Sequence, residues 1–441
     1  MARNRHKRRY ELTIESLSHE GRGIGRIDGK TVFVDLALPG ERVVAERFRK
    51  RAKFDEAIAV EVLEAAPARV APPCEYYARC GGCSLQHLSP SDQISHKASV
   101  LFELLERHAG VAPETPLEPL IGPTEGYRYK ARLGVKHVPK KGGVLVGFRE
   151  RRNPFIAQIG SCIVLHPAVG SRLRELADLV ASLSIPDRIP QLEVAVGDDD
   201  RVALVMRHLA PLTEADRAKL EAFGAAHGFV MFVQPGGADS VTRVGADASL
   251  DVLSYRVDGD IEFRFRPTDF TQVNMAINRA MVDRVIALVD PAPRDRILDL
   301  FCGLGNFSLP LARRAGQVVG IEGEAGLVAR AKANASANGI GNVWFEARDL
   351  ADPASYTTRV TQGFDKLVVD PPRSGAATLF EQADLGAIQR IVYVSCNPAT
   401  LARDVDLAVS RHGFSLTRAG VMDMFPHTAH VESVAVLDRR L

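Results

Sequence analysis

Residues 296–312 read RILDLFCGLGNFSLPLA, an apolar run followed by a glycine-rich turn and a second apolar run. This stretch predicts a buried strand that enters a tight turn and continues into a helix. Alternating strand-like and helical stretches follow it, which predicts a doubly wound α/β sheet over residues 266–441. The further strand-like runs are VVGIEG (318–323), VWFEA (343–347), KLVVD (366–370) and IVYVS (391–395), with two closing strands near 414–420 and 432–438.

The glycine turn lies at the carboxyl end of the first strand, where doubly wound sheets bind their ligands. It begins at Asp299 and contains Gly303 and Gly305. Ser308 occupies the third glycine position of the dinucleotide fingerprint, which counts against a nicotinamide cofactor. The pattern instead predicts a site for S-adenosylmethionine (SAM), with Glu322 placed to accept hydrogen bonds from the ribose. A strand–turn–helix without a ligand is the alternative.

Other strand ends carry reactive groups. The fourth strand ends in DPPR (Asp370–Arg373), and the fifth ends in SCNP, which contains Cys396. A thiolate there can act as a nucleophile, although a buried cysteine is more often a small apolar residue. Glu432 begins the last strand and lies on the same edge if that strand is antiparallel. The neighbouring His427 and His430 could indicate a metal site, but we favour a local turn.

Four of the six cysteines precede this region. Cys74, Cys80 and Cys83 form a C-x5-C-x2-C segment, and Cys162 stands alone. In a reducing cytoplasm such spacing favours metal binding or catalysis over disulfides. The spacing does not distinguish zinc from an iron–sulfur cluster. A fourth cysteine argues against radical SAM chemistry, which needs one iron free of protein ligands.

Residues 1–66 predict a small β-barrel, because short β-prone runs alternate with turn signals. Residues 1–60 hold 14 Lys and Arg against 9 Asp and Glu, whereas the whole chain carries a net charge of only +2. Clustered cations suit an RNA backbone, and a solvated basic tail is an equally good explanation.

Residues 67–265 predict an α+β domain that contains the cysteine segment and a helix at about 91–110. No apolar run approaches the roughly 20 residues that span a bilayer. The basic start, MARNRHKRRY, is followed by no apolar segment or cleavage site. We therefore expect a cytoplasmic protein without a secretory signal or a membrane partner.

Several of these motifs together resemble the RNA uracil-C5-methyltransferases over nearly the whole chain. They are FTQVN (270–274), DLFCGLGNFSLPLA (299–312), DPPR (370–373), VSCNPATLARD (394–404) and FPHTAHVE (425–432). The N-terminal module resembles a TRAM domain, an RNA-binding β-barrel. A TRAM domain with four clustered cysteines is similar to the members that act on 23S rRNA, and the tRNA member lacks both.

The resemblance implies SAM-dependent methylation of carbon 5 of a 23S rRNA uridine, with Cys396 as the nucleophile and Glu432 as the base. It implies that the SAM pocket is lined by Gln272, Phe301, Asn306, Glu322, Asp349 and Asp370. It also implies that a [4Fe-4S] cluster is ligated by Cys74, Cys80, Cys83 and Cys162. Asp349 is a mild departure, since relatives can carry Asn there.

The resemblance further suggests that the helix near 91–110 packs on the catalytic domain, and we expect a monomer. One alternative is the same chemistry on another rRNA or tRNA uridine. A protein that only binds RNA and an iron–sulfur cluster is the second alternative, and retention of both Cys396 and Glu432 argues against it.

Overall fold

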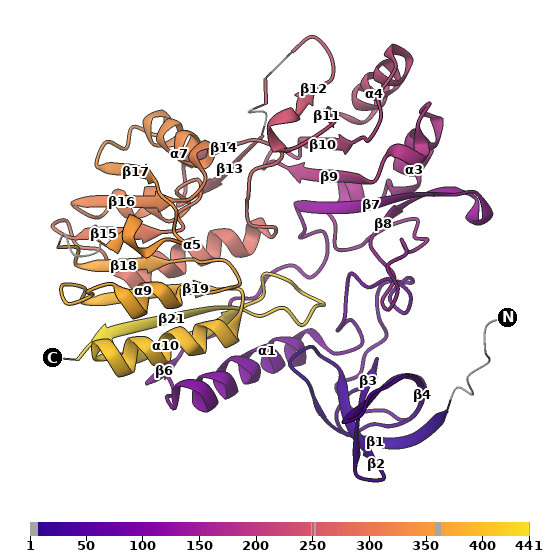
Figure 1. Cartoon of the computed structure of the whole chain (residues 1–441), viewed down its shortest axis with the longest axis horizontal. Helices are drawn as coiled ribbons and strands as arrows, with labels where there is room; N and C mark the ends of the chain where they lie inside the picture. Colours follow the sequence, from indigo (N-terminus) through magenta and orange to yellow (C-terminus); the bar gives the residue numbers. More distant parts are fainter. Residues whose placement is uncertain (1–7, 248, 251–252, 358–362, 441) are drawn as a thin grey trace. The chain divides into compact units, whose positions relative to one another are not determined.

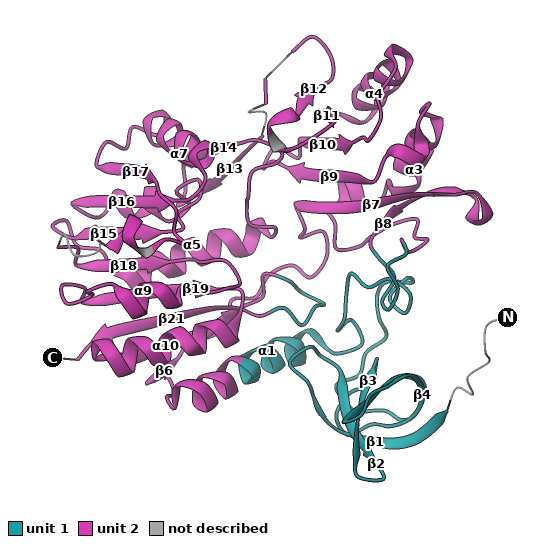
Figure 2. Cartoon of the chain, viewed as in Figure 1, with its two compact units in different colours: residues 1–100, 149–155, 425–430 teal, residues 101–148, 156–424, 431–441 magenta. Residues whose placement is uncertain are grey.

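The computed structural model describes residues 8–247, 249–250, 253–357 and 363–440 (Figure 1). The chain forms two compact units, each assembled from segments far apart in the sequence (Figure 2). Unit 1 comprises Met1–Val100, Arg149–Phe155 and Phe425–His430, and unit 2 comprises Leu101–Phe148, Ile156–Met424 and Val431–Leu441. The domain boundaries near 66 and 265 stay predictions.

Unit 1 contains a closed five-stranded barrel with the strand order β1-β2-β3-β5-β4. Residues of β1 alternate between buried and exposed over most of its length, as expected of a strand with one face on a core. Inside this barrel Asp55 accepts hydrogen bonds from Tyr10 at 3.0 Å and Lys30 at 2.5 Å. The predicted N-terminal β-barrel is confirmed. Its strands are β1 (Arg9–Leu17), β2 (Gly23–Ile27), β3 (Lys30–Asp35), β4 (Arg42–Lys50) and β5 (Phe54–Glu64).

The cysteine segment of unit 1 is mostly irregular and is held by hydrogen bonds to Arg149–Phe155. Cys80 forms an isolated β-bridge with Glu150. The guanidinium group of Arg151 donates to the carbonyl oxygen of Cys83 at 2.7 Å. These bonds give hydrogen-bond partners to backbone groups that lie outside any regular helix or strand. The segment leads into helix α1 (Pro90–Leu104), which continues as the π-helical turn η1 (Leu105–Ala109).

Unit 2 contains a six-stranded sheet with the order β12-β11-β10-β9-β7-β8. Helices α3 and α4 pack against this sheet and against each other around an aliphatic core. The elements are β7 (Lys130–Val138), η2 (Pro139–Lys141), β8 (Gly143–Gly147), α2 (Pro167–Gly170), α3 (Leu173–Ser182), η3 (Pro186–Arg188), β9 (Gln191–Val196), β10 (Val202–Arg207), α4 (Glu214–His227), β11 (Phe229–Gln234), η4 (Ala238–Ser240) and β12 (Thr242–Arg243).

The second sheet of unit 2 has eight strands in the order β17-β16-β15-β18-β19-β21-β20-β6. The first five are parallel, and β21 is antiparallel to both β19 and β20. The predicted doubly wound sheet with a closing antiparallel pair is confirmed. Strand β6, which pairs with β20, has no counterpart in the prediction.

The elements of this region include a preceding two-stranded hairpin, β13-β14. Their bounds are β6 (Thr115–Pro116), β13 (Leu253–Val257), β14 (Ile261–Phe265), α5 (Met275–Val289), β15 (Arg296–Leu300), α6 (Ser308–Ala312), β16 (Gln317–Glu322), α7 (Ala325–Ala337), β17 (Val343–Ala347), η5 (Pro353–Ser355), β18 (Lys366–Val369), α9 (Ala377–Gln382), β19 (Arg390–Ser395), α10 (Pro398–His412), β20 (Phe414–Met422) and β21 (Glu432–Arg439).

Helices cover the central strands of this sheet. Strands β18 and β19 are buried along nearly their whole length, as expected of parallel strands with both faces covered. The turn η1 lies against α10 within the same unit. Along the described residues, no helix has both the length and the hydropathy that crossing a membrane requires.

Candidate active site

One edge of the eight-stranded sheet collects most of the residues that the sequence analysis predicts to be functional. It is formed by the carboxyl ends of the parallel strands and by the first residue of the antiparallel strand β21. The turn Phe301–Asn306 follows β15, Glu322 ends β16, Asp349 follows β17, Asp370 follows β18, Cys396 follows β19 and Glu432 begins β21. The topology therefore places six strand ends at one edge.

The register between β19 and β21 brings the predicted nucleophile and base together. Ser395 pairs with Ser433, and the Ser433 hydroxyl donates to the Ser395 carbonyl oxygen at 3.1 Å. Because the strands are antiparallel, the residue after Ser395 stands opposite the residue before Ser433. Cys396 and Glu432 are those two residues.

Burial and neighbouring charge shift the ionisation of this pair. Burial raises the pKa of Glu432 well above its ordinary value, and Asp370 raises it further. Burial also raises the pKa of the Cys396 thiol, with further increases from Glu432 and Asp370. The guanidinium group of Arg373 opposes both shifts. Arg373 therefore stabilises negative charge on either member of the pair.

The glycine turn after β15 has two glycines in the left-handed backbone region that favours glycine. Gly303 and Gly305 have φ of 54° and 88°. A Cβ atom on Gly305 would also lie 2.9 Å from the Phe345 ring. Glu322 fixes the turn by accepting a hydrogen bond from the Gly303 amide at 3.1 Å. The turn and the acidic end of β16 thus form one connected structure.

Three carboxyl groups gather behind this turn. Asp299 is fully buried; one of its oxygens accepts from the Ser308 hydroxyl at 2.5 Å, and its Oδ1 has no hydrogen-bond partner among the described residues. Burial, with a smaller contribution from Glu322, raises the pKa of Asp299 to about 7. Burial, Asp299 and Glu322 also raise the pKa of Asp370 to about 7. Such a site favours a cationic ligand, and SAM carries a sulfonium and an ammonium group.

Asn306 is held by residues that the sequence analysis did not single out. Its Oδ1 accepts from the Tyr255 hydroxyl at 3.1 Å, and its Nδ2 donates to Asn278 Oδ1 at 2.9 Å. Asn278 is buried on α5, four residues after Asn274, whose side chain caps that helix. Two asparagines on an otherwise apolar helix face were the available signal.

The other two predicted SAM residues are less enclosed. Gln272 is partly buried in the extended segment that precedes α5. Asp349 is exposed, and its Oδ1 accepts a hydrogen bond from the Ala351 amide at 2.9 Å. Both side chains therefore lie on segments outside the regular strands and helices.

The cysteine segment offers sulfur donors in unit 1. Cys74, Cys80 and Cys83 are each partly buried. Cys80 Sγ accepts a hydrogen bond from the Gly82 amide at 3.4 Å. Burial raises the pKa of the Cys80 thiol, and Cys74 raises it further. Cys162 is partly buried in unit 2. In the part of the chain that the structure describes, no three His, Cys, Asp or Glu side chains are arranged as a metal site.

Comparisons with known proteins find two families, one that matches the region of the eight-stranded sheet and one that matches the N-terminal barrel. The family described as tRNA (Uracil-5-)-methyltransferase matches residues 246–440, and the TRAM domain family matches residues 3–54. The crystal structure of a Pyrococcus abyssi tRNA (uracil-54, C5)-methyltransferase with S-adenosyl-L-homocysteine is similar, with a TM-score of 0.72 and 25% identity. The similarity covers 97% of this chain and all of that one.

The fold and the acidic edge of the sheet define this protein as a SAM-dependent methyltransferase with an N-terminal TRAM domain. A relative from Alkalilimnicola ehrlichii named 23S rRNA (uracil(1939)-C(5))-methyltransferase RlmD is 54% identical and covers 98% of this chain and 96% of its own. A relative of the same name from Nitrosococcus oceani is 53% identical, with 97% and 96% covered. The chain belongs to the RlmD family of uracil-C5-methyltransferases, which confirms the resemblance.

Proposed function

We propose that this protein transfers the methyl group of SAM to carbon 5 of a uridine in 23S rRNA, giving 5-methyluridine. The observation that carries the proposal is that Cys396 and Glu432 directly adjoin the paired residues Ser395 and Ser433, at the edge of the sheet that bears the glycine turn. The names and the near-complete coverage of the RlmD relatives support 23S rRNA as the substrate.

The residues proposed to hold SAM supply polar and apolar surfaces around a cationic ligand. They are Gln272, Phe301, Asn306, Glu322, Asp349 and Asp370. Asp299 Oδ1, which accepts no hydrogen bond from any residue that the structure describes, and the carboxyl groups of Glu322 and Asp370 fit the positive charge of that ligand. When it is bound, SAM supplies an electrophilic methyl group.

The uracil needs activation, because its carbon 5 is a poor nucleophile. The Cys396 thiolate forms a bond to carbon 6, and the electrons of the 5,6 double bond move into the ring as an enolate. Carbon 5 would then take up the methyl group of SAM as the bond from that methyl group to the sulfonium sulfur breaks, which would leave S-adenosylhomocysteine as the second product. Glu432 removes the proton from carbon 5, the double bond re-forms, and the bond from sulfur to carbon 6 breaks to release the thiolate. This covalent route replaces one hard step with several easier ones.

The target base must leave its stack to reach this site. Unstacking costs a few kcal/mol, and it costs least for a base that is already unpaired. A uridine in a single-stranded loop of the rRNA is therefore the favoured substrate. The TRAM domain is proposed to bind the surrounding backbone through cations such as the exposed Arg49, Lys50 and Arg51.

Incubation of the purified protein with methyl-labelled SAM should place label in a 23S rRNA transcript as 5-methyluridine. A tRNA transcript in a parallel reaction is the matched control and should take up little label. Nucleoside analysis identifies the product, and RNA from a strain that lacks the gene locates the modified position. Label in tRNA alone would show that the substrate is tRNA and not 23S rRNA. Label in neither RNA would contradict the proposed activity.

We also propose that Cys74, Cys80, Cys83 and Cys162 ligate a [4Fe-4S] cluster. The donors are all thiols, the Gly82 amide donates to Cys80 Sγ, and Arg151 reduces the cost of negative charge on Cys80. Hydrogen bonds and cations near sulfur are among the features that tune iron–sulfur sites. Zinc uses the same donors, so the metal itself must be measured.

Protein purified without oxygen should be brown and contain about four irons per chain. Cys80→Ser should lower the iron content and reduce the yield of soluble protein, because a ligand is lost. Cys302→Ala is the matched control and should retain its iron, since Cys302 is buried in the glycine turn after β15 and is not one of the four proposed ligands. Metal analysis that finds one zinc and no iron would contradict the cluster.

A further inference from the structure

An irregularity in strand β4 of the barrel leaves the ring of Phe48 exposed. The register of β4 on β5 shifts between Arg47 and Arg49, so Phe48 is an extra residue in β4. Bulges of this kind change the direction in which a side chain points. Arg47 donates to the Tyr10 hydroxyl at 2.9 Å and to the buried Asp55 at 3.3 Å, inside the barrel. The Phe48 ring, by contrast, is 42% exposed.

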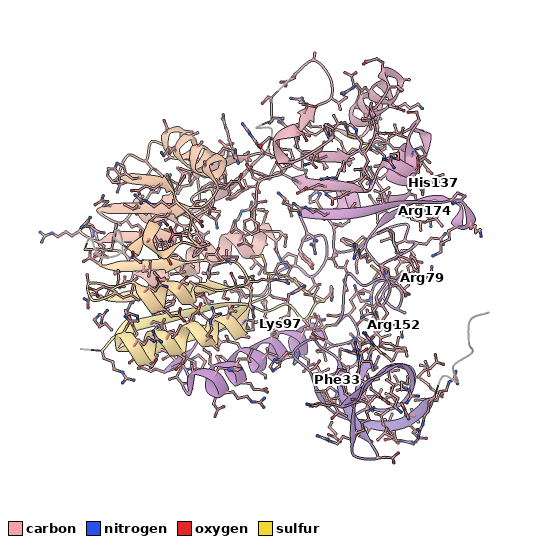
Figure 3. The ribbon with its side chains drawn as sticks, in the orientation of Figure 1. Phe33, Arg79, Lys97, His137, Arg152 and Arg174 are labelled. Atoms are coloured by element: carbon pink, nitrogen blue, oxygen red, sulfur yellow. The ribbon has the colours of Figure 1, made fainter. Side chains whose placement is uncertain are left out.

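Arg152, from the segment Arg149–Phe155 of the same unit, lies over this ring. Its Cζ atom is 4.7 Å from the centroid of the Phe48 ring, within the range of an attractive cation–π contact. Figure 3 labels Arg152, which lies beside the barrel. The Glu150 amide donates to the Phe155 carbonyl oxygen at 2.8 Å and closes the turn that carries Arg152. The ring and the guanidinium plane are therefore held together before any ligand binds, which lowers the cost of ordering them.

Positive charge surrounds these two side chains. Residues 47–53 contain five Lys and Arg and no Asp or Glu, and residues 149–155 contain three arginines and one glutamate. Proteins bind single-stranded nucleic acid with cations along the phosphates and with flat side chains on which bases stack. The charge and the exposed ring together favour an unpaired stretch of RNA over an acidic peptide, which needs the cations alone. The exposed cations are Arg49, Lys50, Arg51, Lys53, Arg149 and Arg152.

We propose that Phe48 and Arg152 form a stacking surface for an unpaired base of the substrate RNA, at a nucleotide other than the target uridine. This inference rests on the proposed function, from which it takes the RNA, and it adds a base contact to the backbone contacts proposed for the TRAM domain. Every base has a π face, so such a surface tolerates different sequences. It selects instead for a base that is free of pairing, as in a single-stranded loop.

Phe48→Ala in the full chain should weaken the binding of a labelled 23S rRNA fragment by about fivefold to a hundredfold. The slope of log K against log salt should stay unchanged, because no cation is lost. Arg152→Ala should weaken binding and also reduce that slope by about 0.7. Phe48→Tyr, which retains the flat ring, should bind as wild type does, whereas Phe48→Leu should behave as Phe48→Ala. Fluorescence anisotropy at several salt concentrations measures both quantities. Val60→Ala, at an exposed apolar residue on β5, is the matched control and should bind as wild type does.

RNA fragments that each lack one base but retain the sugar and phosphates locate the stacked nucleotide. Removal of that base should weaken the binding of wild type by about the same factor as Phe48→Ala does, and should have no further effect on Phe48→Ala. A side chain that only supports the fold would not show this coupling. Wild-type affinity in Phe48→Ala, or additive losses at every nucleotide, would overturn the stacking surface.

Methylation of the intact fragment by wild type is measured in parallel and tests the proposed function separately. Coupling between Phe48 and one base without any methylation would overturn the proposed function and support the stacking surface. Methylation without such coupling would overturn the stacking surface alone.

Discussion

Cys396→Ala is expected to abolish turnover while SAM still binds. Loss of a covalent nucleophile costs roughly four orders of magnitude or more, because the remaining groups cannot replace the missing bond. Carbon 5 of the uracil stays a poor nucleophile when no sulfur adds to carbon 6. SAM binding is expected to persist, since the glycine turn and Glu322 belong to β15 and β16, whereas Cys396 follows β19.

A methyl-transfer assay with labelled SAM measures the turnover, and calorimetry measures the affinity for SAM. Cys396→Ser is a second test, because it replaces the thiol with a hydroxyl of similar size that is a much weaker nucleophile. It should be as inactive as the alanine variant. Activity within tenfold of wild type in either variant would rule out the covalent route, and a loss of SAM binding would show that the thiol also supports the cofactor site.

The charges around the Cys396 thiol suggest that Cys396 and Glu432 are ionised at different steps of the reaction. A carboxylate at Glu432 raises the pKa of Cys396, so the two negative charges oppose each other. Once the sulfur is bonded to carbon 6 it carries no charge, and the ionised form of Glu432 is no longer opposed by it. The base therefore becomes easier to ionise at the step that uses it. Arg373 opposes the rise in the pKa of both groups, which favours each anion in turn.

The sequence predicts the edge of the eight-stranded sheet well, because each residue that we predict to be functional there lies at or near the end of a strand-like run. Asp370 and Cys396 follow runs of apolar residues, and the burial of these runs places them as strands inside the sheet. Their convergence follows from parallel topology alone. The place of Glu432 depends on a further assumption, that the last strand runs antiparallel, and the register of β21 confirms it.

Some elements could not be predicted from local pattern. Strand β9 is a nearly continuous buried run, QLEVAV, without the alternation that identifies a half-exposed strand. Strand β6 has only two residues, one of them proline, and pairs with a strand some 300 positions away. The contacts of Gln93 and Lys97 with the loop 425–430 likewise join residues more than 300 apart. Nothing in either stretch indicates its partner.

Glu432→Gln is expected to stop the reaction after methyl transfer and before release. The amide has nearly the shape of the carboxylate but cannot accept the proton from carbon 5. Loss of a positioned general base costs about a hundred- to ten-thousandfold. Because Cys396 is intact, the bond from sulfur to carbon 6 still forms, and the elimination that would break it cannot proceed. The variant should therefore accumulate a protein–RNA adduct that survives denaturing gels and carries the label from methyl-labelled SAM.

The double variant Cys396→Ala/Glu432→Gln is the control for this result, and it should form no adduct, since the adduct requires the thiolate. Turnover at the wild-type rate in Glu432→Gln would show that another group takes the proton. An inactive variant without adduct would place Glu432 before methyl transfer, in activating Cys396 or in orienting the uracil. An unlabelled adduct would place it at methyl transfer itself. A labelled adduct alone assigns the carboxylate opposite Cys396 to the final proton removal.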